Sequence, residues 1–156
     1  MTLFFLAKWI HILSAAVLLG TGTGIAFFMV VAHRSSNVAA IAHVAGTVVI
    51  ADMLFTATAV VIQPLSGLWL ASLAGWPLTE NWLVATYFLY LLVGACWIPV
   101  LFLQVRMRDL AREAANASTA LPQQYHRLYR TWFVLGVPAF LAMLAIFWLM
   151  IAKPSL

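Results

Sequence analysis

Long apolar runs follow one another along the chain and are interrupted only by short polar stretches. A helix needs roughly 20 mostly apolar residues to cross the hydrocarbon core of a bilayer. The run lengths therefore predict four spanning helices, at about 4–32, 39–63, 82–105 and 128–151. The second run stays apolar to residue 73, although Pro64 should kink or end its helix. Residues 66–75 are then either a kinked extension or a segment lying at the membrane interface.

The longest polar stretch separates the third and fourth runs. Residues 106–124 alternate arginines with two acidic residues and end in a turn-rich region, which predicts a loop or a short surface helix. Cytoplasmic loops carry an excess of lysine and arginine. All six arginines fall on one side of the predicted bundle, and Lys8 and Lys153 fall on the other. Both termini are therefore expected outside.

Composition supports a membrane protein. The 156 residues are 65% hydrophobic and 8% charged, with a mean hydropathy of +1.04, whereas soluble domains are about 45–50% apolar and about 25% charged. We expect one all-α domain over 1–156, a polytopic transmembrane four-helix bundle with its N and C termini outside. The lipid bilayer is its expected surrounding. The net charge of +4 is too dispersed to indicate nucleic acid as a partner.

The first run also contains small residues at four-residue spacing, Gly20 and Gly24. Such a spacing lets two membrane helices approach backbone to backbone. A homodimer through Gly20 and Gly24 is therefore one predicted assembly.

Polar side chains inside the spans are the candidates for chemistry. Counting 1.5 Å per residue places His11, Asp52, Tyr87 and Tyr90 at similar depth, near the outer surface. An ionisable residue in a span usually faces the bundle interior and has a partner, so His11 and Asp52 form the natural pair. We select His11, Asp52 and Tyr90 as cofactor-binding candidates, with His11 as the candidate ligand for a metal.

Three interpretations of this pair stay open. If His11 binds haem iron or a metal ion, Asp52 could accept a hydrogen bond from its ring and fix the ring orientation. If nothing binds, the two side chains could share a proton. Alternatively, Asp52 is protonated and His11 only bonds a carbonyl or a tyrosine hydroxyl.

An alternative inner site consists of His43 and His126, which lie at similar depth near the ends of their helices. They could face each other and ligate haem iron or a metal ion. Boundary histidines of this kind are more often solvated residues of the interface.

Helix one ending in His33 and a last run closing on Lys153 and Pro154 resemble a bacterial family of uncharacterised four-helix integral membrane proteins. That family is catalogued as a domain of unknown function. The resemblance implies a multi-pass protein of the bacterial cytoplasmic (inner) membrane.

The arrangement of apolar runs along the chain is also similar, more distantly, to that of membrane-bound protoporphyrinogen oxidase and of copper-resistance D type proteins. In the oxidases an aromatic residue and a lysine precede an intramembrane histidine, which Lys8, Trp9 and His11 match. This resemblance implies haem or porphyrin in the bundle, with His11 as ligand. The sequence departs from the oxidases in helix three, where Thr86 and Trp97 stand in place of a lysine and a histidine.

Three functions are compatible with these features. The first is a membrane protein that binds haem b or another tetrapyrrole for electron transfer or porphyrin redox chemistry. The second is a non-catalytic scaffold, subunit or assembly factor of a larger complex, whose buried polar groups only specify packing. The third is a transporter for a small solute or metal ion, which four helices without two broken repeats favour least.

Overall fold

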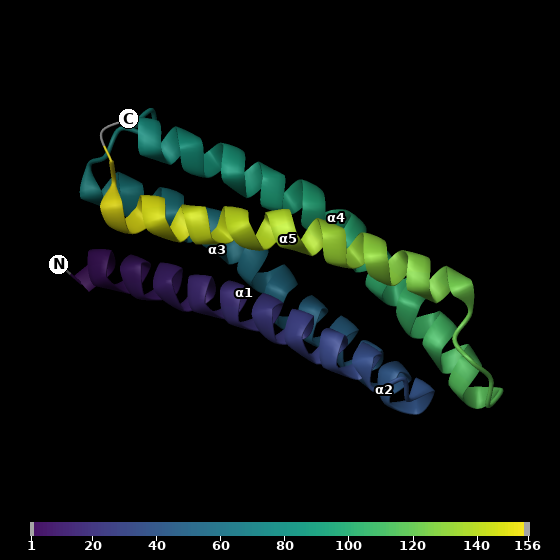
Figure 1. Ribbon diagram of the computed structural model, residues 1–156. Helices are drawn as coiled ribbons and strands as arrows, with labels where there is room; N and C mark the ends of the chain where they lie inside the picture. Colours follow the sequence, from purple (N-terminus) through teal and green to yellow (C-terminus); the bar gives the residue numbers. More distant parts are fainter. Residues whose placement is uncertain (1, 155–156) are drawn as a thin grey trace.

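The computed structural model describes residues 2–154, and nearly all of this part of the chain is helical (Figure 1). The elements are α1 (Thr2–Arg34), α2 (Val38–Ala51), η1 (Asp52–Thr56), α3 (Ala57–Ala74), α4 (Asn81–Asn116) and α5 (Gln123–Ala152). The elements α2, η1 and α3 form one continuous helical rod, Val38–Ala74. Among the described residues, four rods are long and apolar enough to cross a membrane. The predicted all-α four-helix bundle is confirmed.

The second rod continues past the proline that was expected to kink or end it. Its backbone widens at η1, where the N–H of Ala57 bonds the carbonyl of Asp52 five residues earlier, as in a π-helical turn. Pro64 lies inside α3, and the rod ends only at Gly75, which adopts a left-handed conformation with φ 71°. Of the two readings of residues 66–75, the helical extension is therefore the one found.

The prediction of a loop or separate short helix over 106–124 is wrong for its first half, because α4 continues to Asn116. Two causes extend it. The sequence from 106 to 115 is rich in alanine and arginine and also contains leucine, methionine and glutamate, all of them strong helix formers. Its apolar positions also recur at helical spacing, and Met107, Leu110, Ala111 and Ala114 are buried on one face.

Helix pairs divide the bundle into two ends. We call the end that holds residues 2 and 154 and the turn after α3 the terminal end, and the opposite end the arginine end (Figure 1). The helix α1 packs on α3, α4 packs on α5, and α2 joins the two pairs by packing on α4. The largest core cluster, which includes Met29, Ile41, Met107 and Tyr125, lies toward the arginine end. At the terminal end α3 packs on α1, and a cavity lies between this pair and the pair formed by α4 and α5.

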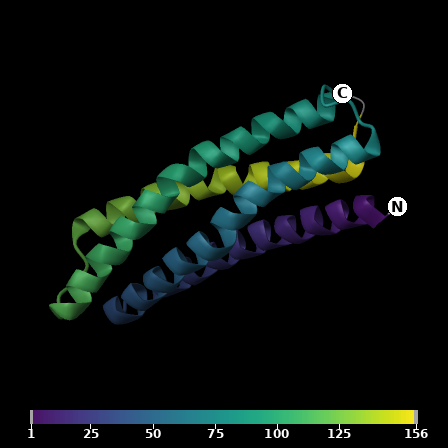
Figure 2. The same cartoon turned by 180° about the vertical axis from the view of Figure 1, so that it is seen from behind.

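Both termini lie at the same end in either view (Figures 1 and 2), as an even number of spans requires. All six arginines lie toward the other end, in the last turns of α1, the second half of α4 and the start of α5. The face predicted to dimerise is not covered within the described chain, since a Cβ added at Gly20 or Gly24 would meet nothing within 4 Å. Homodimerisation remains a prediction.

The arginines predict the orientation of this bundle in its membrane. An alkaline phosphatase fused after residue 156 should be active in a bacterial host, because the positive-inside rule predicts that the terminal end faces the periplasm there. The same enzyme inserted in the connection between α4 and α5 should be inactive, and green fluorescent protein should give the reverse pattern at both positions. An inactive C-terminal phosphatase fusion with a fluorescent C-terminal partner would contradict the orientation.

Candidate functional site

His11 lies in the terminal half of the bundle, where α1 packs against α3. Its ring Nδ1 is 3.1 Å from Ser66 Oγ, and its Nε2 is 3.3 Å from the amide nitrogen of Gln63. Both partners belong to α3 and stand about one helical turn apart, so they reach the two sides of the ring. The imidazole thus has the partners within the protein that a polar group in hydrocarbon requires.

The hydrogen bonds around this ring determine its tautomer. Ser66 Oγ donates its single proton to the backbone carbonyl of Ile62 at 2.7 Å, so it accepts from His11 Nδ1–H. Nε2 then carries the lone pair and accepts from the amide N–H of Gln63. The amide oxygen of Gln63 in turn accepts from the hydroxyl of Ser14. The bond from Ser66 to the Ile62 carbonyl therefore favours the tautomer whose proton is on Nδ1.

Gly67 allows the ring to come this close to α3. A Cβ at this position would stand 3.0 Å from His11 Cε1, which is too close for two carbon atoms in ordinary contact. A side chain at position 67 would push the imidazole away from α3 by at least a few tenths of an ångström.

A cavity of about 660 Å³ adjoins His11 at the terminal end. Its walls come from α1, α3, α4 and α5 and are mainly apolar. Its polar lining residues are Lys8, His11, Gln63, Tyr87 and Lys153. A smaller cavity of about 260 Å³ shares His11, Gln63 and Tyr87 with it. The larger volume lies in the range of about 300 to 1,000 Å³ that is typical of small-molecule and cofactor sites.

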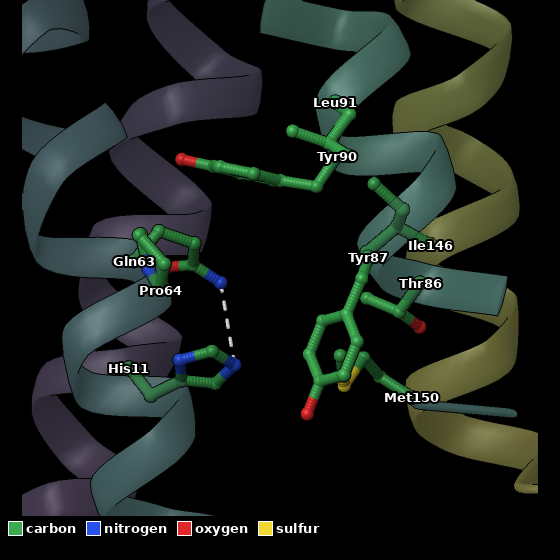
Figure 3. A pocket seen from close by; sticks show the side chains of 9 residues that line it. All are labelled: His11, Gln63, Pro64, Thr86, Tyr87, Tyr90, Leu91, Ile146 and Met150. Carbon is green, nitrogen blue, oxygen red and sulfur yellow. Dashed lines mark hydrogen bonds between the residues drawn. The ribbon is translucent and has the colours of Figure 1, made fainter. Parts of the chain in front are cut away.

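Tyr87 and His11 extend toward the same space from α4 and α1 (Figure 3). The hydroxyl of Tyr87 is buried and has no hydrogen-bond partner among residues 2–154. Leaving a buried hydroxyl unpaired costs about 1 to 3 kcal/mol. A polar atom of a bound molecule could take this position, so Tyr87 joins His11 as a candidate site residue. The residue count along the helix correctly predicts that Tyr87 lies at the depth of His11, but the predicted cofactor-binding tyrosine is Tyr90.

Tyr90 has a structural role that the sequence analysis missed. Its hydroxyl donates to the backbone carbonyl of Val60. That carbonyl stands four residues before Pro64, which has no N–H to complete the helical bond. Tyr90 lines the smaller cavity, but its hydroxyl is committed to the carbonyl that the proline frees.

Asp52 is buried, with 2% of its surface exposed, and its carboxyl group is held by donors from α4. Trp97 Nε1 donates to Oδ1 at 3.3 Å. With the Gln104 amide nitrogen facing the carboxyl group, it donates to Oδ2 at 2.9 Å, and the amide oxygen accepts from Trp132 Nε1 at 3.2 Å. The amide orientation follows from this network, since it satisfies both ends. The carboxyl group thus joins η1, α4 and α5.

The prediction that Asp52 pairs with His11 is wrong. The partners of His11 lie 11 and 14 residues after Asp52 in the same rod, about 16 to 21 Å along it at 1.5 Å per residue. The predicted depth assumes that this helix crosses the membrane by Gln63. Because the rod runs on to Ala74, Asp52 lies near the middle of the bundle, and His11 lies closer to the terminal end.

The alternative inner site is also arranged differently from the prediction. The ring of His126 lies 5.6 Å from that of His33, whereas His43 is exposed. His33 in turn stacks on Tyr129 with ring centroids 3.8 Å apart, which ties the end of α1 to α5. The predicted contact between His43 and His126 is therefore not formed. Among the described residues, no three histidine, cysteine or acidic side chains are grouped to hold a metal ion.

Comparison with known families agrees with this architecture. Residues 5–154 match the family described as "Predicted integral membrane protein (DUF2269)". The chain belongs to this family. The match covers all four rods of the DUF2269 bundle almost completely, so the predicted membership in an uncharacterised membrane family is confirmed.

No curated protein and no solved structure matches this DUF2269 chain. The more distant resemblances to the protoporphyrinogen oxidases and the copper-resistance D type proteins therefore remain predictions. The description of DUF2269 names neither a ligand nor a reaction.

The Asp52 network predicts a stability effect. Replacing Asp52→Leu leaves the N–H groups of Trp97 and Gln104 without an acceptor, which should cost about 1 to 2 kcal/mol. The thermal midpoint in mild detergent, followed by circular dichroism, should then fall by roughly 2 to 8 °C. Asp52→Asn keeps one acceptor oxygen, so its thermal midpoint should fall less.

The matched control is Asp109→Leu, whose carboxylate is partly exposed and pairs only with the neighbouring Arg108. Its midpoint should stay close to that of the unmodified protein. Equal midpoints for Asp52→Leu and Asp109→Leu would show that the Asp52 network does not stabilise the bundle.

Proposed function

We propose that this protein binds a tetrapyrrole, haem b in the first instance, in the cavity beside His11, within the inner membrane of a bacterium. The state of the His11 ring is the observation that carries the proposal. Its Nδ1–H is fixed by Ser66 and its Nε2 lone pair points toward the cavity side. Histidines that ligate metals likewise have one ring N–H held by an oxygen acceptor, and the other nitrogen here, Nε2, becomes available to a ligand once the amide of Gln63 turns away.

The surroundings of His11 also fit a tetrapyrrole better than a bare metal ion. The chain offers one histidine here, and the described residues hold no group of three metal-binding side chains. A porphyrin would bring four nitrogen ligands of its own, so His11 could hold the iron without a second side chain. The amide of Gln63 would turn away from Nε2, and Tyr87 would stand on the opposite wall with a hydroxyl to donate. Bound haem would supply one-electron chemistry.

Absorption spectroscopy tests this proposal. Protein purified in mild detergent and loaded with haem should show a Soret band that shifts on reduction, and His11→Ala should abolish it. Ser66→Ala should weaken haem binding roughly tenfold, because the ring loses the acceptor that orients it. The matched controls, His43→Ala and His126→Ala, remove imidazoles at the arginine end and should leave the band unchanged. A band that survives His11→Ala, or no band in any variant, would refute haem ligation by His11.

A second candidate function is a non-catalytic subunit or assembly factor of a larger membrane complex. The network of Asp52 favours it, because the carboxyl group accepts from Trp97 and Gln104 within the chain and lines neither of the two cavities. Such groups specify packing rather than chemistry. If the second candidate is correct, no chromophore binds and Asp52 variants change stability alone.

A further inference from the structure

The two lysines of the protein line the same cavity. Lys8 comes from the second turn of α1, and Lys153 directly follows α5, yet both belong to the wall of the 660 Å³ cavity. Every other basic side chain with a permanent charge is an arginine toward the arginine end. Segments from opposite ends of the sequence thus bring two positive charges to one apolar space.

No negative side chain balances these charges at the cavity. None of its lining residues is acidic, and among residues 2–154 the only ion pair joins Arg108 to Asp109. Lys153 Nζ instead stands over the ring of Trp76, 3.7 Å from its centroid. A cation–π contact attracts the ammonium group without neutralising its charge.

Lysines near a membrane surface commonly extend toward lipid phosphates. Two features distinguish this pair from scattered interface anchors. Both lysines share one cavity whose other lining is mainly apolar, and that cavity has an imidazole and an unpaired tyrosine hydroxyl farther along its wall. Apolar walls with two cations complement a molecule that has an apolar body and two acid groups.

We propose that Lys8 and Lys153 recognise the carboxylates of an amphiphilic ligand whose apolar body fills the cavity. This inference rests on the proposed function and specifies the ligand, since it requires a tetrapyrrole with free carboxylates. Lys153 leaves the face of Trp76 to pair with one carboxylate, and Lys8 pairs with the other. The body of the ligand then extends toward His11 and Tyr87.

The test compares protoporphyrin IX with its dimethyl ester. Both probes share the same ring and lack iron, so ligation of iron by His11 does not contribute to binding. They differ in their two acid groups, which are charged in the diacid and neutral in the ester. Binding is followed by porphyrin fluorescence with the full chain in a nonionic detergent. The diacid should bind roughly five- to tenfold more tightly than the ester, as expected for two exposed ion pairs. High salt should reduce this difference, because it screens exposed charges.

The double variant Lys8→Gln and Lys153→Gln should bind the two probes with equal affinity. The matched control, Arg34→Gln with Arg130→Gln, removes two charges at the arginine end and should keep the difference. Equal binding of diacid and ester by the unmodified protein, or a difference that survives the lysine variants, overturns the inference. Failure to bind either porphyrin also overturns it.

The porphyrin test and the haem test can fail independently of each other. If haem gives a His11-dependent Soret band while diacid and ester bind equally, the haem proposal stands and carboxylate recognition fails. If no Soret band forms but the diacid preference depends on the lysines, the cavity recognises carboxylates without iron ligation by His11.

Discussion

Polar groups inside a bilayer have no water to pair with, so each break in a helix must be compensated by a neighbouring helix. The second rod has two such breaks, the π-helical turn at η1 and Pro64 within α3. At the proline, the hydroxyl of Tyr90 bonds the carbonyl that is left free. At the π-helical turn, the side chain of Asp52 is held by Trp97 and Gln104. Side chains of α4 thus bond the carbonyl that the proline frees and the carboxyl group at the start of the π-helical turn, and these bonds hold the second rod against α4.

The bundle has two polar layers, one around Asp52 and one around His11, and only the second borders a cavity. In the Asp52 layer the carboxyl oxygens accept from the N–H groups of Trp97 and Gln104, and Asp52 lines neither cavity. The His11 layer borders a cavity, and the hydroxyl of Tyr87 there has no partner in the described chain. The difference follows from packing, since α2 contacts α4 whereas α3 stays with α1. Structural and binding roles are therefore separated along the bundle axis.

The sequence was sufficient to predict the spans, because four apolar runs have the length that a bilayer demands. It could not predict the level of Asp52 relative to His11. That level depends on whether the second helix ends near Pro64 or continues to Ala74, and the bond that lets it continue comes from Tyr90, on another helix.

The sequence also could not predict how each helix is rotated about its own axis. Each residue turns the helix by about 100°, so a boundary histidine can face any neighbour. His33, rather than His43, lies beside His126 for this reason. The extension of α4 to Asn116 could have been anticipated, since Met107, Leu110, Ala111 and Ala114 recur at helical spacing within an otherwise polar stretch.

The bond between Tyr90 and the Val60 carbonyl also constrains how this family can evolve. The hydroxyl is needed only while position 64 lacks an N–H. A relative with another residue at 64 regains the ordinary helical bond, and phenylalanine then becomes acceptable at 90. Positions 64 and 90 are therefore expected to co-vary, although they belong to different helices and are linked only through the carbonyl of Val60.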